Sequence, residues 1–137
     1  MAESMAQDAL GSEGPERGTG WSEDLTFIVP IGRRVREVAG ALGSNANLAA
    51  LLEVSPSQPT RWIQGSERPN SLNARAIVDL DHVVARAALL WQPTVVTSWL
   101  YGHNAFLGGA RPIDVVKLRG AAPVIEALDQ ELAGGYA

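Results

Sequence analysis

The chain has 137 residues, of which 46% are hydrophobic, and it has no cysteine and a formal net charge of −4. This length predicts one domain, or one domain with a tail, and the lack of cysteine excludes disulfides and thiolate metal sites. No apolar run approaches the roughly 18–20 residues of a membrane span, and the N-terminus lacks the basic and apolar parts of a signal peptide. We therefore expect a cytoplasmic protein without a membrane partner.

The charge is distributed unevenly along the chain. Residues 1–26 hold six acidic residues and one arginine, a net charge of −5, and they are rich in Gly, Ser and Glu without periodicity. This composition predicts a disordered acidic tail. Residues 31–75 hold six arginines and three glutamates, a net charge of +3, and residues 76–137 carry −2. Because phosphate binding depends on local positive charge, a nucleic-acid contact would lie in the middle segment.

The first predicted helix lies within residues 27–42 and begins near Pro30. Arg33, Arg34 and Arg36 fall mostly off its apolar stripe, so they either form a solvated face or contact DNA phosphates. The stripe itself, which ends before Gly43, consists of Ile31, Val35, Val38, Ala39 and Leu42.

Residues 47–69 predict two short helices with a break between them. The first carries leucines at helical spacing, and the second is apolar at Trp62 and ends at Gly65. In the break, Ser55 or Ser57 can cap the second helix through its side-chain oxygen. Two helices this short cannot bury themselves alone, which predicts a helix-turn-helix packed on a larger helical core.

The second short helix carries the candidate DNA-binding residues. Glutamine can pair with adenine and arginine with guanine in the major groove, while serine or threonine can reach phosphate. Trp62 is assigned to the core. The alternative is a purely structural helix pair, since this geometry also occurs without DNA. Together with Arg33 and Arg34, the candidates are Ser57, Gln58, Thr60, Arg61, Gln64 and the loop residue Arg68.

A long helix is predicted at about residues 72–90, with Ser71 as its cap. Its apolar spacing is typical of a helix packed along another helix, so it forms the spine of the fold or also meets a second subunit. His82 beside Asp81 has no further ligand at metal-binding spacing, which favours an ordinary surface histidine. The apolar positions are Leu72, Ala76, Leu80, Val83, Ala87 and Leu90.

Three shorter helices are predicted in residues 93–137, each opened by a proline, and Gly108-Gly109 permits a tight turn before the second. The chain is therefore predicted to be all-α, a compact helical bundle. No nucleophile with a base, carboxylate pair or metal set is visible, so we expect no enzymatic activity, metal or cofactor. The buried candidates are Val95, Val96, Trp99, Leu100, Val115, Val116, Leu118, Val124, Leu128 and Leu132.

The run LLEVSPSQPTRWIQGSERP resembles the helix-turn-helix of the Xre (Cro/repressor-like) group. Ala49 is the small residue expected where the two helices cross. The sequence departs from the pattern at Glu53, where many such motifs have glycine, and at Pro59, where an apolar β-branched residue is usual. The matching positions are Val54, Ser55, Trp62, Gly65 and Pro69.

The C-terminal part of the chain resembles the toxin-binding domain of the Xre/MbcA/ParS antitoxins. With the helix-turn-helix upstream, the resemblance covers about residues 30–137. It divides the chain into an acidic tail (1–26), an Xre-like region (27–70), a connecting or dimer helix (71–92) and a toxin-binding domain (93–137). The matching residues are Trp99-Leu100, Asn104, Leu107-Gly108-Gly109, Arg111-Pro112, Asp114, Gly120, Val124 and Gly135-Tyr136.

This resemblance implies the antitoxin of a type II toxin–antitoxin pair, whose usual partner is a RES-domain toxin that degrades NAD. Such antitoxins bind the toxin through the C-terminal domain, repress their own operon at operator DNA, and commonly self-associate as homodimers. A stand-alone helix-turn-helix regulator, and an interaction module without DNA binding, are the alternatives. The candidate toxin contacts are His103, Asn104, Leu107, Arg111, Pro112, Gly135 and Tyr136.

Overall fold

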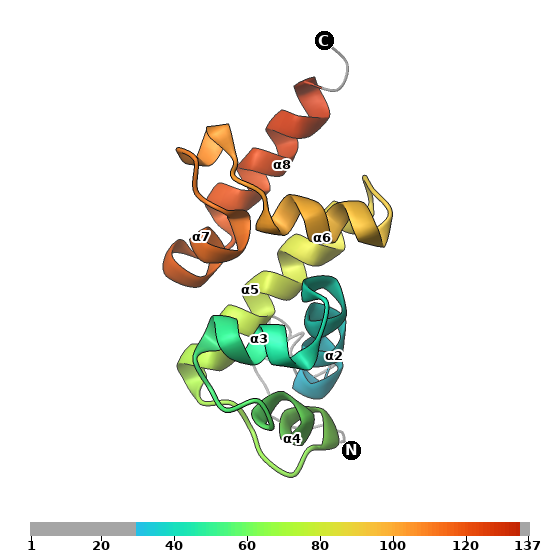
Figure 1. The fold of residues 1–137 in the computed structure, drawn as a ribbon, viewed down its shortest axis with the longest axis vertical. Helices are drawn as coiled ribbons and strands as arrows, with labels where there is room; N and C mark the ends of the chain where they lie inside the picture. Colours follow the sequence, from blue (N-terminus) through green and yellow to red (C-terminus); the bar gives the residue numbers. More distant parts are fainter. Residues whose placement is uncertain (1–29, 135–137) are drawn as a thin grey trace, which may run out of the picture. The chain divides into compact units, whose positions relative to one another are not determined.

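The computed structural model describes residues 30–134, and the part of the chain that begins at Ile31 forms one compact unit (Figure 1). Within the described range there are α-helices, one 3₁₀ helix and no strand, which confirms the predicted all-α fold. None of these helices is long and apolar enough to cross a membrane. The predictions for residues 1–26, Gly135 and Tyr136 lie outside the described residues. The elements are α2 (Ile31–Leu42), α3 (Asn45–Leu52), α4 (Gln58–Gln64), α5 (Ser71–Ala88), α6 (Pro93–Tyr101), η3 (Ala105–Leu107), α7 (Pro112–Arg119) and α8 (Ala122–Gly134).

Helix α2 is the centre of the N-terminal half. It packs against α3, α4 and α5, and its buried residues Val35, Val38 and Leu42 confirm the predicted stripe. Gly32 allows α4 to come close, because a Cβ at this position would lie 2.9 Å from the Trp62 carbonyl oxygen. A side chain on Gly32 would therefore push α2 and α4 apart.

Helix α5 belongs to both halves, since it contacts α2 and α6 as well as α7 and α8. Leu80, Val83 and Ala87 are buried as the predicted seam requires, and Ile77 is buried with them. Leu72 was expected in the same seam but is 76% exposed. The first turns of α5 border a groove between α3 and α7, and within the described range no helix covers Leu72 at this groove.

The structure corrects several further predictions. Val95 and Leu132 were expected to be buried, but each is 44% exposed. Helix α5 is capped by Asn70 and not by Ser71, because Asn70 has the extended backbone of an N-cap and its side chain accepts from the Asn73 N–H at 2.8 Å. Leu118 is 79% exposed instead of buried. It lies about 200° around α7 from the buried Val116, because successive residues of an α-helix are rotated by about 100°.

Helices α6, α7 and α8 form the C-terminal half, with η3 in the turn between α6 and α7. Their buried residues Leu100, Ile113, Val116, Val124 and Leu128 belong to the same hydrophobic cluster as those of α2. One continuous core therefore supports both halves.

Two side chains of α6 close the C-terminal end of α2. The Thr97 hydroxyl donates to the Ala41 carbonyl at 2.7 Å, and the Tyr101 hydroxyl donates to the Leu42 carbonyl at 2.8 Å. The Asn47 side-chain amide also donates to the Leu42 carbonyl, at 2.8 Å. Because the last carbonyls of a helix have no partner within it, these bonds satisfy the end of α2 and join the two halves.

Candidate nucleic-acid interface and protein-binding turn

The turn between α3 and α4 has the backbone shape that glycine favours. Glu53 ends α3 with φ 60° and ψ 44°, and among the described residues it is the only non-glycine with positive φ. The N–H groups of Glu53 and Val54 donate to the carbonyls of Ala50 and Ala49 at 3.2 and 3.0 Å, which closes the helix end. Position 53 is glutamate and not glycine, but its backbone has the left-handed conformation that glycine would adopt there.

An ion pair anchors the same residue to the C-terminal half. The Lys117 ammonium on α7 donates to the Glu53 carboxylate at 2.7 Å. This hydrogen bond, and the charge of Lys117, hold the pKa of Glu53 below its ordinary value. This surface pair, in which the Glu53 side chain is 79% exposed, links the α3–α4 turn to α7.

Helix α4 is held by two buried side chains. Pro59 and Trp62 face inward, which confirms Trp62 as a core residue and shows that Pro59 is buried beside it in the sequence of α4. Ser57 occupies the N-cap position but makes no capping bond, because its backbone is helical with φ −84° and ψ −12°. Its hydroxyl lies instead 3.3 Å from that of Ser55. The predicted side-chain cap is therefore wrong.

The outward face of α4 carries most of the predicted DNA contacts. Ser57, Thr60, Arg61 and Gln64 are exposed, and their spacing places them along one side of the helix, whereas Gln58 is half-buried. The Arg61 guanidinium lies 3.9 Å from the Glu67 carboxylate, with both side chains nearly half exposed. Such a loose pair leaves Arg61 able to contact a ligand.

The flanking arginines differ in their surroundings. Arg33 on α2 and Arg68 after α4 are exposed, as their predicted role at phosphates requires. Arg34 instead faces α5, where its guanidinium forms a 2.7 Å ion pair with Asp81 and its side chain is only 14% exposed. We therefore leave Arg34 out of the candidate interface and assign it to packing between α2 and α5.

The turn between α6 and α7 is organised by Asn104. This residue is 8% exposed, and its side chain accepts from the Leu107 N–H at 3.3 Å. Its backbone N–H donates to the Ala110 carbonyl at 3.0 Å, and its carbonyl accepts from Gly109 at 2.8 Å. Asn104 was predicted to contact a toxin, but its hydrogen bonds are used to close the turn.

Two polar side chains project from this turn. The exposed His103 ring places Nδ1 2.8 Å from the Gly109 carbonyl, so this nitrogen is the donor, and Nε2 has no hydrogen-bond partner among the described residues. Arg111 forms two hydrogen bonds with Asp114, at 2.8 and 3.3 Å, and its guanidinium lies 5.8 Å from the Tyr101 ring centroid. The hydrogen bond to Asp114 raises the pKa of Arg111, so its charge is retained.

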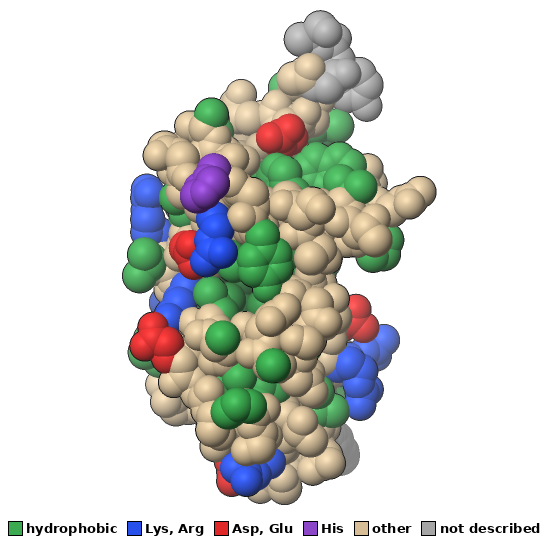
Figure 2. All heavy atoms as spheres, in the orientation of Figure 1, with side chains coloured by type: hydrophobic (Ala, Val, Ile, Leu, Met, Phe, Trp, Pro, Cys, Tyr) green, Lys and Arg blue, Asp and Glu red, His purple; other side chains and the backbone are tan. Residues whose placement is uncertain are grey.

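The remaining predicted contacts are structural. Pro112 is buried at the start of α7, and Leu107 packs partly against the core. Of the candidates that the structure describes here, His103 and Arg111 are therefore the two whose side chains can meet a partner. Figure 2 shows a histidine, cations and carboxylates beside exposed hydrophobic side chains on this face of the molecule.

The sequence predicted Val95 and Trp99 to be buried, whereas Val95 is 44% exposed and Trp99 is half-buried, and it did not single out Phe106. A groove of about 390 Å³ is lined by Val95, Trp99, His103 and Glu131, among others. The Trp99 indole donates to Glu131 at 3.4 Å and packs against the Trp91 ring, with 5.7 Å between ring centroids. The 51% exposed Phe106 on η3 adds an aromatic side chain nearby in sequence. An aromatic residue inside a polar, glycine-rich turn was the signal available for Phe106.

A second groove, of about 330 Å³, lies at Arg111 and is also lined by Tyr101, Asp114, Asn47 and Lys117. No group of three or more His, Cys, Asp and Glu side chains in residues 30–134 could hold a metal ion. The arrangement offers polar and aromatic contacts to a macromolecule. No protein-family model, curated protein or solved structure matches this chain.

Proposed function

We propose that this chain is the antitoxin of a type II toxin–antitoxin pair, acting in the cytoplasm without chemistry of its own. Its helix-turn-helix binds operator DNA, and its C-terminal half binds and neutralises a RES-domain toxin that degrades NAD. The observation that carries the proposal is the α3–α4 unit, in which a left-handed turn at Glu53 and the buried Trp62 present a polar face of α4. The resemblance of residues 93–137 to antitoxin toxin-binding domains supports the second role.

On the DNA side, the chemistry suits the major groove. Arg61 and Gln64 carry the groups that pair with guanine and adenine, and the exposed Arg33 and Arg68 can neutralise phosphates. The net charge of +3 in residues 31–75 is modest, so binding by a monomer would be weak and sensitive to salt. A homodimer would strengthen it by presenting two recognition helices to half-sites about 34–36 Å apart.

On the protein side, the groups that project from the α6–α7 turn are typical of interface centres. Arginine and aromatic side chains are enriched there, and this turn combines Arg111 with Tyr101 and the exposed Phe106. His103 adds a free ring nitrogen. Gly135 and Tyr136 complete the proposed toxin contact.

The DNA role is tested by Arg61→Ala. Loss of a bidentate base contact costs about 1–3 kcal/mol, so we expect operator affinity to fall about tenfold or more in fluorescence anisotropy while the Tm stays unchanged. Arg86→Ala is the matched control, because Arg86 has the same 45% side-chain exposure and also pairs with one carboxylate. Equal affinities for the two variants would exclude α4 as the recognition helix.

The toxin role is tested by expressing the chain together with an adjacent reading frame that encodes a RES-type protein. Wild type should restore growth and cellular NAD. Arg111→Ala, and deletion of residues 135–137, should impair rescue without lowering operator affinity. Normal rescue by both variants would remove the turn and the terminus from the mechanism.

The alternative is a stand-alone regulator whose C-terminal half serves dimerisation or another partner. The hydrogen bonds from Thr97 and Tyr101 to the end of α2 favour this alternative, because the C-terminal half thereby supports α2, against which α3 and α4 pack. Operator binding without any RES-type neighbour would support this alternative. Toxin rescue without operator binding would instead support a pure interaction module.

A further inference from the structure

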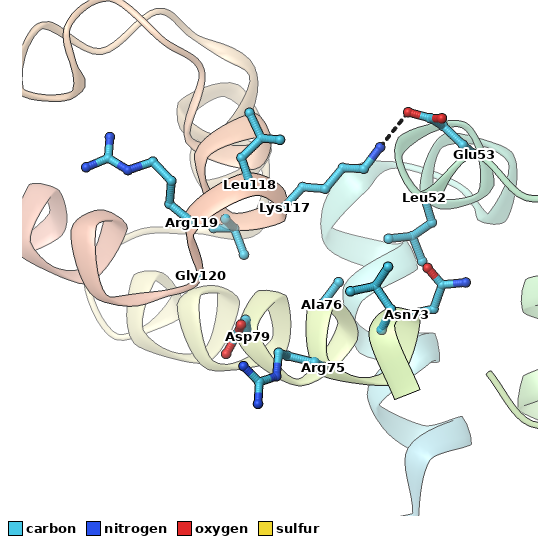
Figure 3. Close-up of a pocket in the computed structure, with 12 residues that line it drawn as sticks. Leu52, Glu53, Asn73, Arg75, Ala76, Asp79, Lys117, Leu118, Arg119 and Gly120 are labelled. Carbon is cyan, nitrogen blue, oxygen red and sulfur yellow. Dashed lines mark hydrogen bonds and ion pairs between the residues drawn. The ribbon is translucent and has the colours of Figure 1, made fainter. Parts of the chain in front are cut away.

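A groove separate from both proposed surfaces lies between the end of α3, the first turns of α5 and the end of α7 (Figure 3). Its volume is about 550 Å³, and the core residues Leu52 and Val116 contribute to its lining. The ion pair of Glu53 and Lys117 separates it from the Arg111 groove, since these two residues line both. The proposed function leaves this groove unused.

Its walls expose two large apolar side chains. Leu72 on α5 is 76% exposed and Leu118 on α7 is 79% exposed, and both line the groove. Single exposed leucines are ordinary. Here two leucines from different helices line one groove, with Leu52 and Ala76 beside them, so its lining is apolar on both walls.

The charges at the groove favour an acidic ligand. Arg75 and Arg119 project from opposite walls (Figure 3), and neither forms an ion pair with any other residue in the described part of the chain. Lys117 is already paired with Glu53. Asp79 is the remaining carboxylate in the lining, so among the described residues the groove has two guanidinium groups and one carboxylate outside any ion pair.

We propose that this groove binds an acidic amphipathic helix of a partner protein. The apolar side of that helix covers Leu72 and Leu118, and its carboxylates pair with Arg75 and Arg119 at the rim. Nucleic acid is a poorer ligand, because its phosphates would meet exposed leucines and the Asp79 carboxylate. A second copy of this chain is also a poorer ligand, because binding groove to groove would place the same excess of positive charge on both sides of the interface.

The test uses the full chain and two labelled synthetic helical peptides. Both carry leucine at positions i, i+3, i+4 and i+7, and their remaining positions are glutamate in one and lysine in the other. In fluorescence anisotropy we expect the glutamate peptide to bind at least tenfold more tightly than the lysine peptide. The double variant Arg75→Glu/Arg119→Glu should reverse this preference.

The apolar contact is tested by Leu118→Ser, which should weaken binding of the glutamate peptide about tenfold. Leu89→Ser is the matched control, because Leu89 is 81% exposed but lies outside the groove lining. These side chains are exposed, and an unchanged thermal melt for each variant checks that the fold is kept.

Three results would overturn the proposal. One is equal or absent binding of the two peptides, and another is binding that none of the groove variants alters. The third is self-association in sedimentation that Leu118→Ser abolishes and Leu89→Ser does not, since a second copy would then occupy the groove. None of these measurements involves operator DNA or a toxin, so their outcome does not affect the proposed function, which is tested by the separate experiments above.

Discussion

The turns that carry the two candidate surfaces reach left-handed backbone in different ways. In the α6–α7 turn the positions with positive φ are Gly108 and Gly109, at 72° and 88°, whereas in the α3–α4 turn the position is Glu53, at 60°. Glycine adopts this conformation freely, but a residue with a Cβ is strained in it. Glu53 is kept there by its neighbours: its N–H caps α3, and its carboxylate holds Lys117.

This difference indicates which interactions stabilise each turn. The α3–α4 turn depends on packing around Trp62 and on a contact with α7. The α6–α7 turn depends on the hydrogen bonds of Asn104, which lie within the turn itself. Variants that remove packing should therefore affect the first turn, and variants that remove local hydrogen bonds should affect the second.

The largest expected effect is that of Trp62→Ala. Trp62 is 3% exposed in the core cluster, and truncating a buried tryptophan destabilises a protein by about 3–5 kcal/mol. Urea unfolding should show this loss in the free energy of unfolding. Trp99→Ala, at a half-buried tryptophan of the other half, should cost clearly less. Equal losses would contradict the view that packing at Trp62 holds the helix-turn-helix.

Asn104→Ala should have an intermediate effect, of about 1 kcal/mol, because the Leu107 N–H loses its side-chain acceptor but keeps the Asn104 carbonyl. Urea unfolding measures the loss, and NMR shift changes should be confined to residues around the turn. Asn104→Asp is the control, because it keeps the acceptor oxygen. If Asp and Ala variants are equally unstable, the hydrogen bond is not what closes the turn.

Glu53→Gly and Glu53→Ala separate backbone strain from the ion pair. Both remove the pair with Lys117, but only glycine relieves the left-handed strain. The glycine variant should therefore melt about 3 °C above the alanine variant in calorimetry. Lys117→Ala gives the effect of the ion pair alone. Identical melting of the two Glu53 variants would show that the turn relaxes to another conformation.

The smallest expected effect is on the pH dependence of stability. The pKa of Glu53 is lowered in the folded state by Lys117, so the ion pair stabilises the fold above the unfolded-state pKa. That stabilisation is lost as the pH falls below about 4.3 toward the lower folded-state pKa. The small Tm difference between wild type and Lys117→Ala at pH 7 should therefore vanish in acid. A difference that persists at pH 3 would mean that Lys117 acts through packing.

Periodicity predicted much of this fold because the core follows local spacing. The stripe of α2, the end of α4 at Gly65 and the burial of Trp62 agree with the structure. The outward face of α4 was also predictable, since residues three and four apart share a side of a helix. The left-handed backbone at Glu53 was not predicted, because the sequence has glutamate where the Xre-type motifs that it resembles often have glycine.

Features that depend on distant neighbours were not predictable. Leu72 and Leu118 were expected among the buried residues, yet no other helix of residues 30–134 covers them, and they are 76% and 79% exposed. Arg34 meets Asp81, 47 residues further along the chain, so its spacing alone could not assign it to packing. Asn104 was predicted as an outward contact because a single sequence does not reveal that its hydrogen bonds close a turn ending at Ala110.

The bonds from α6 to the end of α2 have a practical consequence for engineering. The Thr97 and Tyr101 hydroxyls donate hydrogen bonds to the carbonyls of Ala41 and Leu42, which lie 56 and 59 residues earlier in the chain. As last carbonyls of α2, these groups have no partner within that helix. A chimera that kept the first helices and took everything after residue 92 from another protein would have to reproduce both hydroxyl donors. A change in the proposed DNA specificity is therefore best introduced by resurfacing α4 within the intact chain, rather than by exchanging whole segments.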